Sequence, residues 1–330
     1  MHNIILDTDP GIDDAQAIAF ALCHPDINLL GLTSVFGNAD INVTTQNALL
    51  VLEQFGFSDV PVARGASEPL QQARMPAPDF VHGLDGMGEL NLMPINTTEV
   101  NESAAEFIVR MVNERPDEIS LVAIGPLTNI AQAVMLDPSL PTKVKELVVM
   151  GGAIDTPGNV TPSAEANFVN DPHAADVVCA YDWPLSIIGL DVTLQVPLSD
   201  QDLAQLRDGA GTIGQFIWDS SRYYIDFYAS TNEYGGKRQC AMHDASALVY
   251  LVEREAFEFL SGPARVVADG IAVGALVLDR FDRTSAALFP YWQDRPRISA
   301  AIGVDSTRVR DCFLNTILQS VSPQPGDRHG

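Results

Sequence analysis

The sequence predicts a single α/β domain over residues 1–321, with a mainly parallel central sheet flanked by helices in a Rossmann-like core. Three observations lead to this fold class. Buried strand-like runs alternate with helical patterns almost throughout the chain, which favours a parallel sheet with helices on both faces. A chain of 330 residues with 46% hydrophobic content can bury a large core. Polar or glycine-rich turns follow five strand-like runs, and parallel sheets bind ligands at those strand ends.

Apolar runs and helical spacing place the elements along the chain. Strands are predicted at residues 4–6, 27–36, 60–63, 119–124, 147–150 and 185–189, with further β-structure at 265–268, 270–278 and 297–304. Helices are predicted directly after the first strand and at residues 43–55, 102–114, 128–136, 171–181, 214–234 and 307–321. The proline- and glycine-rich stretch 64–101 is typical of a lid or binding loop, and residues 322–330 are expected to be a disordered tail.

The turn after the first strand carries four carboxylates in eight residues, Asp7, Asp9, Asp13 and Asp14. Asp13 can cap the helix that follows, but capping uses one carboxylate and not four. Like charges this close raise one another's pKa values unless a cation offsets them. Carboxylate oxygens are the ligands that Ca²⁺ and Mg²⁺ prefer, so the turn predicts a site for a hard cation.

Other motifs with acidic or glycine-rich turns fit this stretch less well. An EF-hand is excluded because its twelfth position, counted from Asp7, is Ile18 instead of Glu. A dinucleotide fingerprint is excluded because the turn has one glycine where three are needed. An aspartyl-nucleophile phosphatase would also place an Asp-x-Asp after its first strand. Here Pro10-Gly11 follows that pair, and no lysine stands well placed near a later strand end, so the phosphatase with Asp7 as nucleophile is a rival only.

Composition bounds the partners and the compartment. The formal net charge is −24 and the sequence pI about 4.3, so the surface repels phosphate backbones and anionic lipid. We therefore expect no nucleic-acid partner and no membrane partner, and no leader or membrane-length apolar run is evident. The cysteines are scattered without Cys-x-x-Cys spacing, which favours a reducing cytoplasm.

The motif DTDPGIDDA at residues 7–15 resembles the signature of the inosine–uridine nucleoside hydrolases. These are Ca²⁺-dependent enzymes that cleave the N-glycosidic bond of ribonucleosides. Further segments that are similar to the family's motifs follow in order at the predicted strand ends, namely 37–38, 124–131, 150–152, 158–159, 165–167 and 242–244. Their combination makes the resemblance specific, and it covers nearly the whole chain.

The resemblance implies a Ca²⁺ site made by Asp9, Asp14, Asp244 and the backbone carbonyl of Ile124. A cation with 6–8 oxygen ligands would retain open positions for ribose hydroxyls and a water. Asp9 is the expected general base, and His243 is the expected group that protonates or polarises the departing base.

The resemblance also implies the residues that contact the nucleoside. The expected ribose-binding residues are Asp13, Asn38, Met150, Asn159, Glu165 and Asn167. Relatives commonly have Phe at the position of Ala166, so that wall of the pocket is expected to be wider here. Tyr224, Tyr228 and Tyr234 are expected to face the base, although core packing is an alternative for the first two. His82, in the loop-rich stretch, is expected to close over the nucleoside.

The expected activity is Ca²⁺-dependent hydrolysis of ribonucleosides to free base and ribose, for nucleoside salvage. Uridine and cytidine are the expected substrates, and the sequence leaves open whether inosine is cleaved as well. The resemblance implies a homodimer or homotetramer. A non-enzymatic Ca²⁺-dependent ribose- or nucleoside-binding protein is the alternative, and it is disfavoured because the general base Asp9 is intact.

Overall fold

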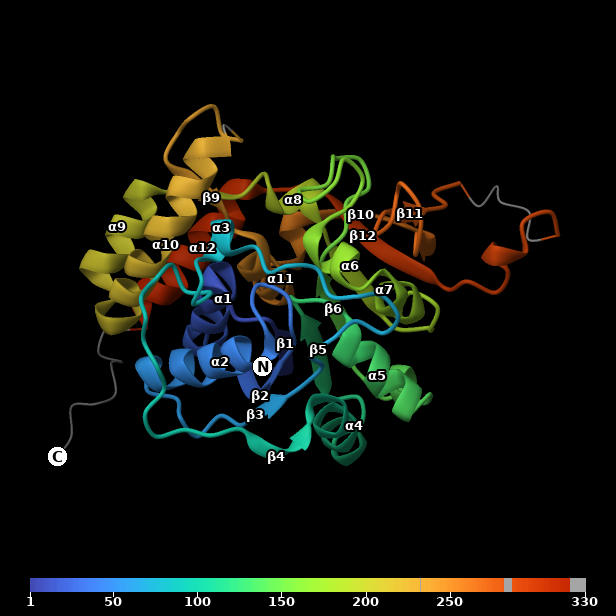
Figure 1. The fold of residues 1–330 in the computed structure, drawn as a ribbon, viewed down its shortest axis with the longest axis horizontal. Helices are drawn as coiled ribbons and strands as arrows, with labels where there is room; N and C mark the ends of the chain where they lie inside the picture. Colours follow the sequence, from blue (N-terminus) through green and yellow to red (C-terminus); the bar gives the residue numbers. More distant parts are fainter. Residues whose placement is uncertain (232, 282–286, 321–330) are drawn as a thin grey trace.

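A central, mainly parallel sheet runs through the molecule, and helices cover both of its faces (Figure 1). The computed structural model describes residues 1–231, 233–281 and 287–320. Within these residues ten strands form the sheet, in the order β11-β10-β12-β7-β6-β5-β1-β2-β3-β4. All neighbouring strands from β12 to β4 are parallel, whereas β10 pairs antiparallel with both β11 and β12.

The strands of the sheet range in length from three residues in β3 to ten in β10. They are β1 (His2–Thr8), β2 (Ile27–Ser34), β3 (Val62–Arg64), β4 (Val100–Ser103), β5 (Ile119–Ala123), β6 (Glu146–Met150), β7 (Leu185–Ile188), β10 (Phe257–Val266), β11 (Leu276–Leu278) and β12 (Arg297–Val304). A separate antiparallel pair consists of β8 (Pro197–Ser199) and β9 (Gln239–Ala241).

The helices connect these strands. They are α1 (Ile12–Cys23), α2 (Ile41–Phe55), α3 (Asp79–His82), α4 (Ala104–Glu114), α5 (Thr128–Leu136), α6 (Ala166–Asn170), α7 (Pro172–Val178), α8 (Leu190–Thr193), α9 (Asp200–Gly209), α10 (Gly211–Thr231), α11 (His243–Val252) and α12 (Ser306–Gln319). Short 3₁₀ turns lie at Leu140–Thr142, Arg254–Ala256 and Pro290–Trp292. None of the helices in the described residues is both long and apolar enough to span a membrane.

Two hydrophobic clusters, one on each face, hold the helices to the sheet. In β1 the side chains of Ile4 and Leu6 join the cluster formed with α1, α2 and α9 to α12. Ile5, which points to the opposite face, joins the cluster formed with α4, α5 and α7. Both faces of the strand are buried, as expected for a parallel strand, and this explains its continuous apolar sequence.

The strand order reverses at β1, which lies between β5 and β2. Loops that leave a parallel sheet at such a point diverge, and they open a crevice beyond the carboxyl ends of the strands. The acidic turn follows β1 directly, and the Gly125–Asn129 segment follows β5. The topology therefore brings together the two motifs that the sequence singled out.

The predicted fold class is confirmed, and most predicted elements are found within a few residues of their expected bounds. The C-terminal β-structure differs from the prediction, because β10 already begins at Phe257 and the chain then turns before the short β11. Gly270 and Gly274, with φ of 78° and 84°, form that turn. Helix α9 is not predicted from the sequence, because it buries only Leu203 and Leu206 and so has little apolar periodicity. The expected tail, 322–330, lies outside the described residues.

Asn129 ties together the ends of three neighbouring strands. Its Nδ2 donates to Asp7 Oδ1 at 2.7 Å and to the Ser34 carbonyl at 2.9 Å. Its Oδ1 accepts from the backbone N–H of Ala66 at 2.8 Å. All three side-chain hydrogen bonds hold groups at the carboxyl edge of the sheet, below the acidic turn.

Asn129→Ala should therefore destabilise the protein by about 2–4 kcal/mol, because it leaves buried polar groups without their partner. Asn28→Ala removes an exposed asparagine that bonds Asn3 at 2.9 Å, and should change stability by no more than about 0.5 kcal/mol. Urea denaturation of both variants measures the difference. Equal losses would show that Asn129 does not hold the strand ends.

Candidate active site

The acidic turn between β1 and α1 is buried and tied internally. The first oxygen of Asp14 accepts from Thr8 Oγ1 at 2.5 Å, and the second accepts from the Gly11 backbone N–H at 2.9 Å. Asp14, and not Asp13, therefore closes the start of α1, which corrects the expected cap. Asp13 does not take part in capping the helix. Its Oδ2 accepts from Tyr224 at 3.2 Å, while its Oδ1 has no hydrogen-bond partner in the described chain.

Three carboxylates from two helices converge beside this turn. One oxygen each from Asp13, Asp14 and Asp244 lies within 4.8 Å of the others. Asp244 stands in the first turn of α11 and the other two in the first turn of α1, so two helix N-termini with their partial positive charge face the cluster. Burial raises the pKa of Asp13 and of Asp14 to about 6, and it raises the pKa of Asp244 well above the usual range. The charges of the neighbouring carboxylates raise the pKa values of Asp14 and Asp244 further.

Asp9 lies beside this cluster, with its carboxylate enclosed by glycines. A Cβ on Gly37 would lie 2.0 Å from Asp9 Oδ2, and one on Gly125 would lie 2.6 Å from Asp9 Oδ1. Oδ2 accepts from the Asn38 backbone N–H at 2.8 Å, whereas the buried Oδ1 has no partner among the described residues. Burial, followed by the charge of Asp14, raises the pKa of Asp9 well above its usual range.

These groups fit a hard cation. Buried acceptors without a donor are costly, and Asp9 and Asp13 each leave one such oxygen at the site. Asp14 and Asp244 add further carboxylate oxygens. The donor set is made of oxygens, which Ca²⁺ and Mg²⁺ prefer over nitrogen or sulfur. A bound divalent ion would offset the repulsion among the carboxylates.

The predicted carbonyl of Ile124 lies at the same edge of the sheet. Asn167 Nδ2 donates to it at 3.0 Å and also donates to the Met150 carbonyl at 3.2 Å. Asn167 thus links the ends of β5 and β6 from the start of α6. Asn38, from the loop after β2, reaches the acidic turn with its side chain, because its Nδ2 donates to Asp14 Oδ2 at 2.9 Å.

Glu165 supports the loop that ends at α6. Its carboxylate accepts from three backbone N–H groups, those of Gly152, Asn167 and Phe168, at 2.9, 2.9 and 3.2 Å. Burial nevertheless raises its pKa to about 7. Asn159, from the same loop, is exposed, and its Oδ1 accepts from Ala166 N at 3.0 Å. Of the expected ribose-binding residues, Asn159 is the one that the structure leaves exposed.

An aromatic wall from α10 faces the carboxylates. Tyr228 shares a hydrogen bond of 2.8 Å between its hydroxyl and His243 Nε2, and Thr193 Oγ1 bonds the other ring nitrogen at 2.7 Å. Burial lowers the pKa of His243 to about 4, so the imidazole is neutral near pH 7. Tyr234 lies behind this pair, where its hydroxyl donates to the Leu194 carbonyl at 3.1 Å and its ring is 5.6 Å from that of Tyr228.

His82 is held against the acidic turn. Its Nδ1 accepts from the backbone N–H of Ile12 at 3.2 Å, and its ring stacks on Tyr224 at 5.5 Å. Burial lowers its pKa to about 4. The loop-rich stretch therefore reaches the site, as expected, and in this state it is anchored there.

Sequence reasoning missed two buried polar residues that support the site, Asn47 and Thr193. Asn47 bonds the carbonyls of Pro10 and Asp85, and Thr193 bonds His243. Asn47 lies within an apolar helical pattern, whereas Thr193 ends the four-residue helix α8 just after β7. In neither place does a single polar residue indicate its partner.

Comparison with known proteins agrees with this geometry. A family model described as inosine-uridine preferring nucleoside hydrolase matches residues 4–311. The probable uridine nucleosidase 1 of Oryza sativa subsp. japonica is 42% identical over 317 residues, which cover 96% of each chain. The inosine-uridine preferring nucleoside hydrolase of Leishmania major is 36% identical over 84% of this chain and 88% of that one.

Solved structures give the same answer. A plant nucleoside hydrolase, the PpNRh1 enzyme, superposes with a TM-score of 0.88 at 34% identity, over 96% of this chain and 99% of that chain. A purine-preferring ribonucleoside hydrolase from Gardnerella vaginalis also has a TM-score of 0.88, at 31% identity, over 96% of this chain and 98% of that chain. The chain therefore belongs to the inosine–uridine preferring nucleoside hydrolase family and is a ribonucleoside hydrolase.

Proposed function

We propose that this enzyme hydrolyses uridine and cytidine, and inosine as a further substrate, in a Ca²⁺-dependent reaction. The observation that carries the proposal is the group of buried carboxylates with two unpartnered oxygens, Asp9 Oδ1 and Asp13 Oδ1. Uridine is named first because relatives at 42% identity carry the name uridine nucleosidase. Cytidine joins it because a relative from Shewanella baltica at 33% identity carries the name pyrimidine-specific ribonucleoside hydrolase. Neither the phosphatase nor the non-enzymatic binding protein accounts for membership of a hydrolase family over residues 4–311.

The residues that would hold the ion are Asp9, Asp14, Asp244 and the Ile124 carbonyl, with Asp13 beside them. When bound, Ca²⁺ supplies positive charge next to the attacking water and the ribose hydroxyls. Asp13 and Asn38 then offer an acceptor and an amide donor to the 2′- and 3′-hydroxyls. Asn167 and the Met150 carbonyl would line the same side of the sugar.

Asp9 is the proposed general base. Its Oδ2 is held by the Asn38 N–H, so its buried and unpartnered Oδ1 remains available for a proton. Oδ1 takes a proton from water as the water oxygen bonds to C1′ of the ribose. The bond from C1′ to the base nitrogen breaks, and its electron pair leaves with the base. The base then needs a proton or a hydrogen-bond donor to stabilise that charge.

His243 and Tyr228 are proposed to serve the departing base. A neutral imidazole carries one N–H, so when His243 donates to Thr193 through Nδ1, its Nε2 accepts from Tyr228, and the reverse holds for the other tautomer. Only the tautomer with the proton on Nε2 leaves a proton for the base, because His243 then donates to Tyr228 and the Tyr228 O–H is free to donate. Tyr224, whose hydroxyl is bonded to Asp13, would line the pocket between sugar and base.

We further propose that the enzyme is a cytoplasmic homodimer or homotetramer that serves nucleoside salvage. The four cysteines, Cys23, Cys179, Cys240 and Cys312, are free thiols, which supports a reducing compartment. Size-exclusion chromatography with light scattering gives the oligomeric state.

Removal of Ca²⁺ should abolish uridine hydrolysis, and Ca²⁺ should restore it, because the buried carboxylates repel one another without a cation. Protein stripped with a chelator, with its metal content confirmed by elemental analysis, is assayed on uridine, cytidine and inosine before and after Ca²⁺ is added. Full turnover in metal-free protein would contradict the proposal.

The stabilisation by Ca²⁺ should depend on pH. The folded pKa of Asp13 and of Asp14 is about 6, above the value of an unfolded aspartate, which is about 3.9. Such a raised pKa gives stability that is present below about pH 4 and is lost as pH rises through about 6. Because Ca²⁺ needs the ionised carboxylates, it should raise the melting temperature strongly at about pH 8 and little at about pH 4.5. Scanning fluorimetry that gives equal shifts would refute the site.

Asp9→Asn should leave a folded protein whose turnover of uridine is lower by at least ~10²-fold, the usual scale for the loss of a general base. The amide retains an oxygen ligand but cannot take the proton. Asp26→Asn, at an exposed position, is the matched control and should keep wild-type kcat. An Asp9→Asn enzyme within a few-fold of wild type would move the base to another residue.

His243→Ala should slow the hydrolysis of uridine by ~10²-fold or more and largely spare p-nitrophenyl riboside, whose leaving group needs no proton. The ratio of the two kcat/KM values measures the effect. Equal losses on both substrates would assign His243 to ribose binding or to folding.

A further inference from the structure

Asn47 joins two segments of the active site that are distant in sequence. Its side chain is buried in α2, with 5% of its surface exposed. Its Nδ2 donates to the Pro10 carbonyl at 3.0 Å and to the Asp85 carbonyl at 2.9 Å. Pro10 belongs to the turn that carries Asp9 and Asp14, and Asp85 belongs to the loop that follows His82. One amide group therefore holds the turn and the loop at a fixed separation.

The loop, residues 83–91, is a preformed unit. The carboxylate of Asp85 accepts from the backbone N–H groups of Met87, Glu89 and Asn91 at 2.8, 2.9 and 2.7 Å. Gly86 has a φ of 72°, in the left-handed region that favours glycine. Because its internal hydrogen bonds fix its shape, the position of the loop relative to the turn depends on the contacts between the two.

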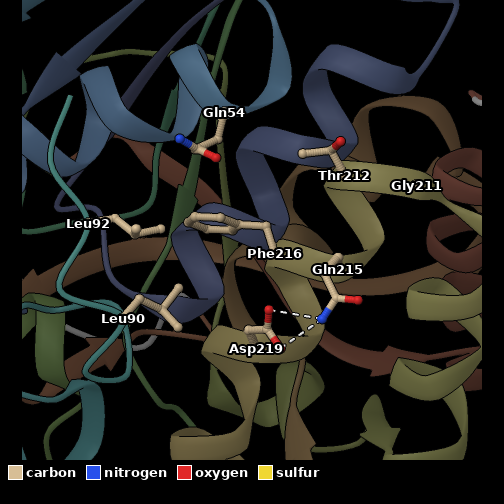
Figure 2. A pocket seen from close by; sticks show the side chains of 8 residues that line it. All are labelled: Gln54, Leu90, Leu92, Gly211, Thr212, Gln215, Phe216 and Asp219. Carbon is tan, nitrogen blue, oxygen red and sulfur yellow. Dashed lines mark hydrogen bonds between the residues drawn. The ribbon is translucent and has the colours of Figure 1, made fainter. Parts of the chain in front are cut away.

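A surface pocket separates part of the loop from α10. A pocket of about 520 Å³ lies between Leu90, Leu92 and Phe216, and Figure 2 shows both leucines extending toward the aromatic ring. Leu92 is exposed at 43% of its surface. Met87 is the buried side chain of the loop and joins the hydrophobic core, and the hydrogen bonds at Asn47 add a polar attachment to the acidic turn.

We propose that Asn47 is a positioning residue that holds the 83–91 loop against the acidic turn and so controls capture of the nucleoside. The inference rests on the proposed function, because it assigns to the loop the task of covering the substrate. It concerns the placement of His82, whose Nδ1 lies 4.0 Å from Asp13 Oδ1.

The turn and the loop pack too closely for a side chain to fit at the glycines between them. A Cβ on Gly86 would lie 2.9 Å from Asn47 Nδ2, and one on Gly11 would lie 2.7 Å from His82 Nδ1. The turn has anchors of its own, since Asp14 bonds Gly11 and Asp9 bonds Asn38. Loss of the Asn47 amide therefore releases the loop more than the turn. We therefore expect loss of the Asn47 amide to weaken substrate capture and to leave the proton transfer at Asp9 unchanged.

Two variants separate Asn47 from its loop partner. Asn47→Leu keeps the shape of the side chain and removes both donated hydrogen bonds. Gly86→Ala leaves Asn47 intact and pushes the loop away from it. Gly56→Ala is the matched control, because Gly56 ends the same helix with a similar φ of 82° and a Cβ there meets nothing within 4 Å.

Each of the two variants should raise KM for uridine by about tenfold, the scale of one to two lost hydrogen bonds, with kcat within about threefold of wild type. Hydrogen exchange should quicken in residues 83–91 and stay unchanged in α1. The double variant should be no worse than either single variant, because both break the same contact. Gly56→Ala should change neither KM nor the exchange of the loop.

The inference fails if Asn47→Leu leaves loop exchange unchanged, if it lowers kcat with KM unaltered, or if the double variant shows additive losses. Should the wild-type enzyme not turn over uridine at all, the proposed function fails instead. The exchange of the loop in Asn47→Leu would still decide the role of Asn47, because that measurement needs no substrate.

Discussion

The crowding of buried carboxylates at the end of β1 is the constraint on which the rest of the structure depends. Asp9, Asp13, Asp14 and Asp244 are all buried, and burial raises each of their pKa values. Buried carboxylates without a positive partner destabilise a protein. In this fold the partial positive charges of helix N-termini lie beside them. The N-termini of α1 and α11 supply two of these, and a bound cation would supply the charge that the helices cannot.

In the proposed reaction, the two sides of the site would serve different parts of the nucleoside. The sheet side, made by the loops after β1, β2, β5 and β6, presents oxygens and amides suited to a sugar and an ion. The helix side, made by α10 and α11, presents tyrosines and a neutral histidine suited to a base. Asp244 and His243 are neighbours at the start of α11, so one helix end contributes to both sides.

The sequence could predict the parts of the site that are concentrated in motifs, and it missed those that act through single contacts. Asp9, Asp14 and Asp244 stand in motif segments, and the alternation of strands and helices explains why the segments meet. The sequence predicts Asp13 as the cap of α1, but the side chain that closes the start of the helix is that of Asp14. The two residues are adjacent aspartates, and only the helix geometry decides which side chain points back to the backbone of Gly11. Asn47 lies in a helix whose apolar periodicity hides its contact with the turn at Pro10. Thr193 lies in the four-residue helix α8, and its partner His243 is 50 residues away at the start of α11.

The glycines at the strand ends acquire a physical reason once the carboxylates are placed. As turn residues they are ordinary, and turn propensity alone would explain them. A Cβ at Gly37 or Gly125, however, would enter the space of the Asp9 carboxylate, at 2.0 and 2.6 Å. A Cβ at Gly11 would meet Asn38 Nδ2 at 2.7 Å. Each of three separate loops thus has a glycine where a side chain would collide with Asp9 or with Asn38, whose backbone N–H donates to Asp9. The glycines belong to the site because they leave space for these two residues.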